Sequence, residues 1–274
     1  MVWVAKQVDA QGCGPCVRNG RAGSNPVPHP TLRRTTWKTK VYKMAMSDFP
    51  KIYCPFIRKD FDVNKDEWEK YGRQLQLRRP SVYLVTKEIN PGYEWVFEDK
   101  DTFAVEKLDG SNVKLMTENG RLTGLQNRKN VIDPLQIVKG KSFILEGVFQ
   151  SIGKGYVKQD GVQVGELIGP KLQGNPYEMT THLWYPFVKA IKHLSYRSFH
   201  EHDRTFENWS SWFKDWLVSR FATKRGNKDI MAEGVIFYNL KRKAENKIYR
   251  AKLRRDMFEW YYSDKITIYD YILK

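Results

Sequence analysis

The sequence predicts an α+β fold in which mixed antiparallel sheets are flanked by helices. Two observations lead to this prediction. Short runs of β-branched and aromatic residues recur between about residues 81 and 253, and turn residues such as Asn90, Pro91 and Gly92 separate them. Between about Arg204 and Ala222, apolar residues instead repeat with the period of a helix. The 274 residues suffice for one large domain or two smaller ones.

Composition favours a polyanionic partner. The formal net charge is +16, and nucleic acid is the first candidate partner for such a basic protein, although a basic surface also keeps proteins in solution. A hydrophobic content of 41% excludes a chain that is disordered throughout. No run of about 18 apolar residues exists, so no membrane span is predicted. Three cysteines, an odd count, fit a reducing cytoplasm.

Residues 1–45 differ from the rest of the chain. They hold eight Lys and Arg against one acid and show no hydrophobic period, which predicts a disordered basic segment. Cys13-Gly14-Pro15-Cys16 looks like a redox tetrapeptide, but no strand or helix start is readable around it. Gly20–Pro28 also resembles translation through a tRNA gene. Met44 or Met46 would then be the true start, and upstream DNA without a tRNA gene would exclude this hypothesis.

The following residues predict one short helix and several strands. Asp62 to Leu75 begins with acids and has Asn64 as a candidate N-cap, while Trp68 and Tyr71 share one face with Leu75. Ser142–Phe149 is apolar and rich in β-forming residues. Strands are predicted at Ser81–Thr86, Tyr93–Phe97, Thr102–Val105, Val113–Met116, Arg121–Gln126, Val162–Ile168, Glu233–Tyr238 and Lys247–Leu253.

The stretch from Arg204 to Ala222 predicts the main helix, with Thr205 as its candidate N-cap. Six apolar residues recur on one face, at i, i+3, i+4, i+7, i+8 and i+12: Trp209, Trp212, Phe213, Trp216, Leu217 and Phe221. Tryptophans at helical spacing indicate a core stripe more often than a platform for stacking bases. A basic loop follows, over residues 222–229.

The most informative stretch is Glu106 to Leu115, where a lysine lies between two predicted strands. Lys107, Asp109 and Gly110 form Lys-x-Asp-Gly, a pattern that a solvated hairpin would also show. The stretch resembles motif I of the covalent nucleotidyltransferases, the superfamily of ATP-dependent DNA ligases, RNA ligases and mRNA capping enzymes. This resemblance implies that Lys107 attacks the α-phosphate of ATP. Because only a neutral amine attacks phosphorus and an ordinary lysine is protonated at pH 7, cationic neighbours are expected around it.

Further matches follow in the family's order, so the resemblance extends from Thr102 to Asp256. It implies that Arg128 binds the incoming phosphate end and that Phe187 stacks on adenine. It also implies that Glu166, in Gly165-Glu166-Leu167, accepts hydrogen bonds from the ribose hydroxyls. Glu146 is a rival for that last role.

The last two motifs supply charge. Glu233 matches the glutamate that serves the metal, Mg²⁺ or Mn²⁺, since hard cations prefer carboxylate ligands. Lys252 matches a motif that is usually Lys-x-Lys, and Arg250 stands at the first basic position, so its role is less defined. The resemblance implies that these cations neutralise charge as pyrophosphate departs, and that Asp109 orients Lys107 or a metal-bound water.

Two features indicate the branch of the superfamily. Asn112, five residues after Lys107, resembles the phage-type RNA ligases that seal nicks in duplex RNA, whereas DNA ligases and capping enzymes usually carry arginine there. About 22 residues follow Lys252, too few for an appended OB-fold domain. The resemblance therefore implies an ATP-dependent RNA ligase in residues 46–274, with a helical insertion at about 190–229.

Two alternatives remain open at this point. One is a minimal ATP-dependent DNA ligase, which would seal an all-DNA nick as well as one with RNA on the 3′ side. The other is an RNA-binding protein that keeps the fold without catalysis. The expected partner is RNA, either a nicked duplex or a tRNA-like molecule, and the expected state is a monomer in the cytoplasm, or in the host cytoplasm if a phage encodes the protein.

Overall fold

A computed structural model gives the fold and describes residues 49–133, 140–201, 203–244 and 247–269. These residues belong to one compact unit, Ala45–Lys274. The predictions for residues 1–45, including Cys13 and Cys16, lie outside the described residues. No helix in the described ranges is long and apolar enough to cross a membrane.

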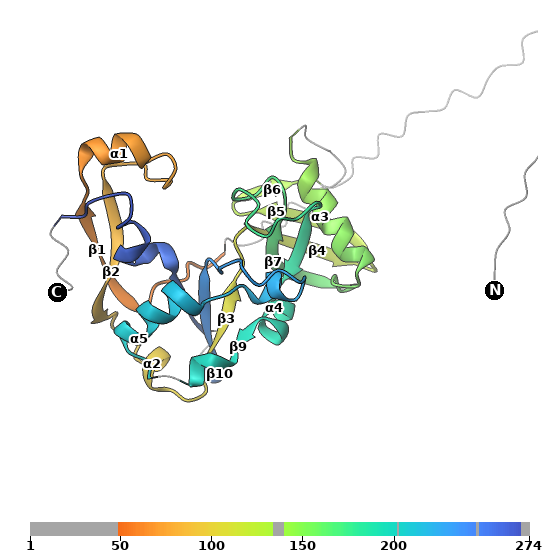
Figure 1. Ribbon diagram of the computed structural model, residues 1–274. Coiled ribbons are helices and arrows are strands. Elements are labelled where there is room, and N and C mark those ends of the chain that lie inside the picture. The colour runs from red at the N-terminus through yellow and green to blue at the C-terminus, as the bar shows by residue number, and fades with distance from the viewer. Residues whose placement is uncertain (1–48, 134–139, 202, 245–246, 270–274) are drawn as a thin grey trace, which may run out of the picture. The chain divides into compact units, whose positions relative to one another are not determined.

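Three antiparallel sheets form the framework (Figure 1). The first pairs β1 with β2, the second has the order β11-β10-β3-β9, and the third has the order β6-β5-β4-β7-β8. The strands are β1 Phe56–Asp62, β2 Ser81–Ile89, β3 Phe103–Lys107, β4 Ser111–Glu118, β5 Arg121–Asn127, β6 Asn130–Ile132, β7 Gly161–Ile168, β8 Leu183–Pro186, β9 Ser195–Tyr196, β10 Gly234–Ala244 and β11 Lys247–Arg254. The prediction of antiparallel sheets is confirmed, and seven predicted strands overlap β2, β3, β4, β5, β7, β10 and β11.

The first predicted helix is confirmed as α1, Lys65–Tyr71. The Asn64 side-chain oxygen accepts hydrogen bonds from the backbone N–H groups of Asp66, at 3.0 Å, and Glu67, at 3.1 Å. It therefore satisfies two of the donors that a helix leaves free at its start.

The β-rich reading of Ser142–Phe149 is wrong. This segment is the helix α3, Ser142–Gly153, which packs on β7 and β8 of the five-stranded sheet. Its buried residues Ile144, Leu145 and Val148 meet Leu167 and Trp184 in one apolar cluster. A short apolar run does not distinguish a strand from a buried helix. The segment is 12 residues long, which is typical of a helix and longer than most strands.

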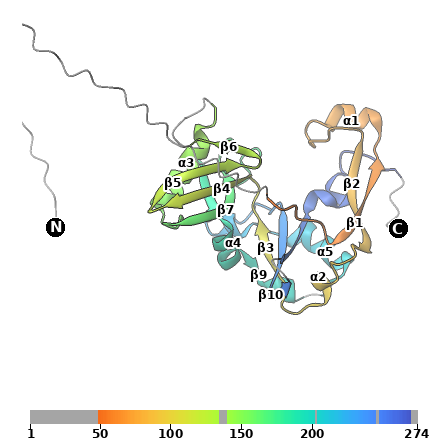
Figure 2. The same cartoon turned by 180° about the vertical axis from the view of Figure 1, so that it is seen from behind.

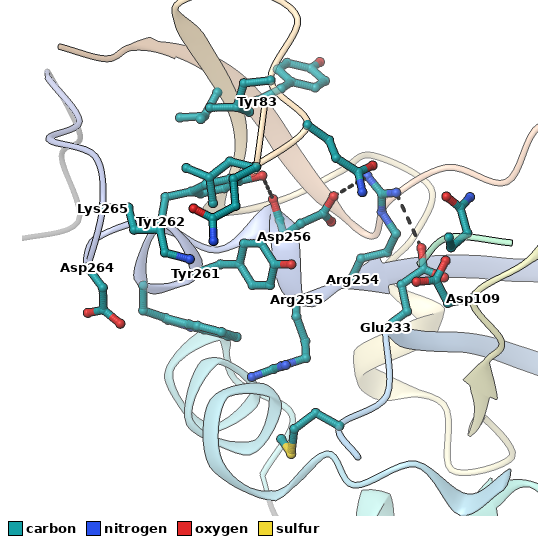
Figure 3. A pocket seen from close by; sticks show the side chains of 18 of the residues that line it. Tyr83, Asp109, Glu233, Arg254, Arg255, Asp256, Tyr261, Tyr262, Asp264 and Lys265 are labelled. Carbon is teal, nitrogen blue, oxygen red and sulfur yellow. Dashed lines mark hydrogen bonds and ion pairs between the residues drawn. The ribbon is translucent and has the colours of Figure 1, made fainter. Parts of the chain in front are cut away.

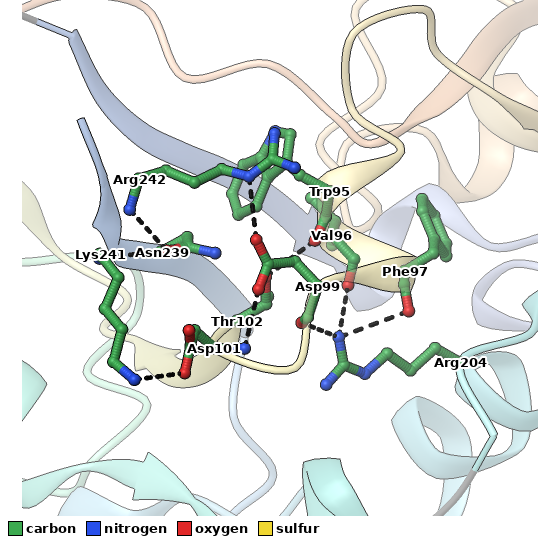
Figure 4. Close-up of polar contacts among 10 residues, drawn as sticks. All are labelled: Trp95, Val96, Phe97, Asp99, Asp101, Thr102, Arg204, Asn239, Lys241 and Arg242. Carbon is green, nitrogen blue, oxygen red and sulfur yellow. Dashed lines mark hydrogen bonds and ion pairs between the residues drawn. The ribbon is translucent and has the colours of Figure 1, made fainter. Parts of the chain in front are cut away.

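The strand predicted at Tyr93–Phe97 is also wrong, because Trp95–Glu98 form the one-turn helix α2. Its last carbonyl groups are satisfied by a distant side chain (Figure 4). Arg204 donates from Nη1 to the backbone oxygens of Val96 at 3.3 Å, Phe97 at 3.4 Å and Asp99 at 2.6 Å. This tertiary contact overrides the β propensity of the segment.

The predicted helix over residues 204–222 is broken into three short pieces. They are α5, Phe206–Ser211, a π-helical turn η2, Trp212–Trp216, and α6, Arg220–Thr223. Thr205 caps α5 as predicted, accepting from the N–H of Asn208 at 3.3 Å. The π turn changes the helical phase, so Trp209 and Trp212 are buried while Trp216 is 72% exposed.

Apolar clusters cover both faces of the four-stranded sheet. Residues that alternate along a strand point to opposite faces. One face contributes Ala104, Phe237 and Leu253 to a large aromatic cluster. The other contributes Val105 and Tyr238 to a second cluster, shared with α4, Phe187–His193. Lys107 is the last residue of β3 and Arg254 the last of β11, and neither belongs to these apolar clusters. Figure 2 shows β3 and β10 side by side from behind.

Candidate functional site

The candidate site lies at one edge of the four-stranded sheet, where β3 and β11 end and β10 begins. Gly234, at the start of β10, is the register partner of Lys107 in β3 and of Arg254 in β11. A Cβ atom on Gly234 would lie 2.2 Å from the backbone oxygen of Leu253. Glycine is therefore required there, which accounts for the Glu-Gly pair in the sequence.

Lys107 is held by Glu233. The Lys107 Nζ donates a hydrogen bond to Glu233 Oε2 and a longer one, 3.4 Å, to the backbone oxygen of Leu108. The other oxygen of Glu233 lies 3.5 Å from Arg254 Nη1, and Arg254 also pairs with Asp256 at 2.9 Å (Figure 3). The Lys107 and Glu233 side chains are 23% and 17% exposed, so a ligand has access to both.

Lys252 lies on the same face of β11 as Arg254, since the two positions are i and i+2 of one strand. Its pKa is lowered, first by burial and then by the positive charges of Arg254 and Lys107. The structure thus places a second lysine within electrostatic reach of Lys107. Arg250 lies earlier in β11 than Lys252 and is the register partner of Tyr238 in β10.

The turn after Lys107 is held from outside the sheet. The N–H of Asp109 donates to the Tyr177 hydroxyl at 2.8 Å, and Gln173 Nε2 donates to the backbone oxygen of Gly110 at 3.3 Å. A Cβ on Gly110 would lie 2.1 Å from the backbone oxygen of Leu167, so only glycine fits. Burial, and next the charge of Glu233, raise the pKa of Asp109 to about 7.

Glu166 and Asn112 are direct partners across β7 and β4. Burial raises the pKa of Glu166 to about 8, while the charge of Lys107 and a hydrogen bond from the Asn112 side chain oppose that rise. Glu166 therefore lies within the field of Lys107. Asn112 Oδ1 is buried and has no hydrogen-bond partner in the described part of the chain, so it can accept a hydrogen bond from a ligand.

Glu146 occupies a different place. It lies on α3, where its carboxylate accepts a hydrogen bond from the N–H of His182 at 3.0 Å and contacts His182 Nδ1 at 2.8 Å. The Nε2 of this imidazole accepts from the N–H of Lys171 at 3.2 Å, so Nδ1 is the ring nitrogen that faces Glu146 as a donor. Glu146 thus fixes a buried histidine.

Arg128 and Phe187 lie at the edges of the site. Arg128 is exposed in the turn between β5 and β6, with a φ of 52°, and its N–H donates to the Asn112 backbone oxygen at 3.2 Å. Phe187 is half-buried and opens α4, next to Pro186, which is the partner of Gly165 across β7 and β8. The backbone therefore ties each of them to the strands that carry Asn112 and Glu166.

Reasoning from the sequence missed Arg254, Asp256 and Arg58. A signal for Arg254 was present, because Arg250, Lys252 and Arg254 alternate and so share one face of a strand. Arg58 gave no such signal, since it lies in β1, far before Lys107 in the sequence.

The described residues contain no group of three or more His, Cys, Asp or Glu side chains arranged to hold a metal ion. The carboxylates of Glu233 and Asp109 nevertheless lie within each other's field. Mg²⁺ is usually bound through one or two carboxylates together with substrate phosphates, so this pair fits a metal that arrives with a nucleotide.

The similarity of this chain to known proteins is weak. No family model and no curated protein matches it. Among solved structures, it is similar to Naegleria gruberi RNA ligase with PPi, at 17% identity and a TM-score of 0.40, over 62% of this chain and 54% of that one. A variant of the same ligase with ATP and Mn matches at 15% identity and a TM-score of 0.40, over 79% and 63%. This chain thus covers less than two-thirds of the length of the ligase structures that it resembles.

Proposed function

We propose that this chain is an ATP-dependent RNA ligase that joins 5′-phosphate and 3′-hydroxyl RNA ends through a lysyl-AMP intermediate on Lys107. The contact between Lys107 and Glu233, which are 126 residues apart in sequence, carries the proposal. A lysine paired with a carboxylate, with Lys252 and Arg254 beside it and Glu166 in its field, combines a nucleophile with the charges that nucleotidyl transfer requires.

In the first step, the neutral amine of Lys107 attacks the α-phosphorus of ATP. An N–P bond forms, the P–O bond to the β-phosphate breaks, and pyrophosphate leaves, while the amine releases a proton. Lys252 and Arg254 stabilise the negative charge that grows on the phosphate oxygens. Glu166 and Asn112 bind the nucleoside, and Phe187 supplies a ring to stack on adenine.

A divalent metal fits the pair formed by Glu233 and Asp109. When bound there, Mg²⁺ would neutralise phosphate charge and compete with Lys107 for the Glu233 carboxylate, which favours the neutral amine. Arg250 remains a candidate for a contact with phosphate from further along β11.

In the second step, AMP passes from Lys107 to the 5′-phosphate of an RNA end. In the third, a 3′-hydroxyl attacks that activated phosphate, a phosphodiester forms and AMP leaves. Arg128, exposed beside Asn112, is suited to hold the 5′-phosphate because a guanidinium binds phosphate through two parallel hydrogen bonds.

The test is incubation with Mg²⁺ and ATP labelled at the α-phosphate, followed by denaturing electrophoresis. Wild type should retain the label, Lys107→Ala should not, and the exposed Lys100→Ala should label like wild type. Absence of label with either ATP or GTP, in folded protein that is not already adenylylated, would contradict the proposal. Sealing of nicks with RNA or DNA on the 3′ side then separates an RNA ligase from a DNA ligase.

A further inference from the structure

A large cavity adjoins the candidate site. It has a volume of about 1230 Å³, and Asp109, Glu233 and Arg254 line part of it (Figure 3). The rest of the wall comes from β1, β2, the segment after α1 and residues 255–265, with smaller contributions from residues 173–177, 214–215 and 231–232. A cavity for one small ligand usually measures about 300–1,000 Å³. This one is larger, and Lys107, Glu166 and Asn112 are not among the residues that line it, so it adjoins the proposed nucleotide site and is not that site.

Two half-exposed tyrosines face this cavity from separate elements. Tyr83, on β2, is 47% exposed, and Tyr261, in the 3₁₀ helix η4, Glu259–Tyr261, is 43% exposed. Trp260 lines the same cavity. Exposed aromatic rings inside a concave surface are suited to stacking on bases, which is how proteins hold single-stranded nucleic acid.

Arginines accompany these rings. The Arg58 guanidinium lies over the Tyr83 ring, 4.0 Å from its centroid, and its Nη2 donates to the Tyr83 backbone oxygen at 2.7 Å. Its Nε is buried without a hydrogen-bond partner among the described residues. Arg255 lies 5.4 Å from the Trp260 ring centroid, and its Nε and Nη2 donate to the backbone oxygens of Phe213 at 2.9 Å and Lys214 at 3.4 Å, so Nη1 is the nitrogen left to meet a phosphate. The cavity thus offers donors for phosphate beside surfaces for bases.

The charged groups of the candidate site act on the hydroxyl group of Tyr261. The pKa of its hydroxyl is raised by burial first, and then by the charges of Asp256, Asp109 and Glu233. Tyr261 therefore lies within electrostatic reach of Glu233, the partner of Lys107. Arg58, which contacts Tyr83, lies within the field of Arg254 and Asp256.

We propose that this cavity binds a single-stranded stretch of two or three nucleotides of the RNA substrate, next to its reacting end, with bases stacked on Tyr83 and Tyr261 and phosphates held by Arg58 and Arg255. The inference rests on the proposed function, because that function supplies the reacting end. The nucleotide site assigned to Lys107, Glu166 and Asn112 does not account for this cavity, because none of these three residues lines it.

The experiment measures binding of a short, fluorescently labelled, 5′-phosphorylated single-stranded RNA by anisotropy, in the Lys107→Ala background so that no reaction occurs. Because stacking on an aromatic side chain is worth about 1–3 kcal/mol per base, Tyr83→Ala and Tyr261→Ala should each raise the Kd about 5- to 150-fold. Tyr83→Phe and Tyr261→Phe keep the ring and should bind like the parent. Trp216→Ala, which removes a more exposed ring outside the cavity, should leave the Kd unchanged.

The outcomes are separable. Unchanged Kd values for both tyrosine variants, or an equal loss with Trp216→Ala, would overturn the proposal, as would phenylalanine variants that bind as weakly as the alanine variants. With Lys107 present, the tyrosine variants should still accept label from ATP at the wild-type concentration dependence. A higher ATP requirement with unchanged RNA affinity would assign the cavity to ATP instead. If wild type takes no label at all, the ligase function fails, while the RNA affinities still decide the role of the cavity.

Discussion

The buried carboxylate of Glu106 accepts a hydrogen bond of 2.6 Å from the hydroxyl of Ser219. It also accepts one of 2.7 Å from the N–H of Phe221, at the start of α6. Glu106 directly precedes Lys107, so these bonds fasten the end of β3 to α6. Burial raises the pKa of Glu106 to about 7, and the hydrogen bond from Ser219 opposes that rise.

Ser219→Ala should lower both stability and activity. The substitution leaves a buried carboxylate short of one donor and removes the cap of α6, at a cost of about 1–3 kcal/mol. At about 2–4 °C for each kcal/mol, Tm should fall by several degrees. Labelling of Lys107 should slow, because its strand end is less well held. The exposed Ser263→Ala is the control, and identical melting curves for the two variants would contradict the anchor.

Gly110→Ala should abolish labelling. Its Cβ would meet the backbone oxygen of Leu167 at 2.1 Å, and since backbone does not move aside cheaply, the turn that carries Asp109 must shift. Gly153→Ala is the matched control, because a Cβ there meets nothing within 4 Å. Circular dichroism and α-phosphate labelling together make the measurement. Full labelling of Gly110→Ala would show that the close approach is not needed.

Substitution of Glu146 should lower stability, whereas substitution of Glu166 should weaken ATP binding. Glu146→Ala removes the acceptor for the buried His182 and should cost about 1–3 kcal/mol of stability without changing ATP affinity. Glu166→Ala should weaken ATP binding, which equilibrium binding to the Lys107→Ala protein measures without turnover. A loss of ATP affinity with Glu146→Ala alone would return the ribose-binding role to Glu146.

The stability of the protein should depend on the protonation of Glu166. Its pKa is raised to about 8 by burial, against an ordinary value near 4.3. A carboxyl with a raised pKa contributes stability that is complete below its ordinary pKa and is lost as the pH rises through about 8. The Tm of wild type should therefore fall relative to that of Glu166→Gln between pH 5 and pH 9. Asp109 and Glu106 shift in the same direction, so the comparison with the variant is the measurement, and parallel curves would contradict it.

Alternation made most of the strands predictable. In β3, β10 and β11, residues such as Val105, Ile236 and Leu253 carry the apolar signal of a sheet, and these strands lie where they were predicted. The errors have a common cause. Ser142–Phe149 and Tyr93–Phe97 are short apolar runs whose length and tertiary partners, not their composition, decide between strand and helix. Arg204, which satisfies the end of α2, lies more than 100 residues away.

Some residues of the candidate site could be predicted from the sequence, and others could not. Lys107, Glu233, Lys252, Glu166 and Asn112 come together within electrostatic or hydrogen-bond reach in the structure, and their roles remain predictions to be tested. Arg58 could not be found from the sequence, because its relation to Asp256 and Arg254 depends on how β1 and β2 pack against residues 254–262. No spacing along the chain encodes that packing.

The central position of β10 has a consequence for biosynthesis. β10 lies between β3 and β11, and its first residue, Gly234, aligns Lys107 with Arg254. Pairings this distant in sequence close late in folding, because the loop between them loses much entropy. During synthesis Lys107 must therefore remain without its partners until β10 and β11 have left the ribosome. If Lys107 accepts AMP as proposed, labelling would report that these two strands have paired with β3, so it would serve as an assay for folded, newly made protein.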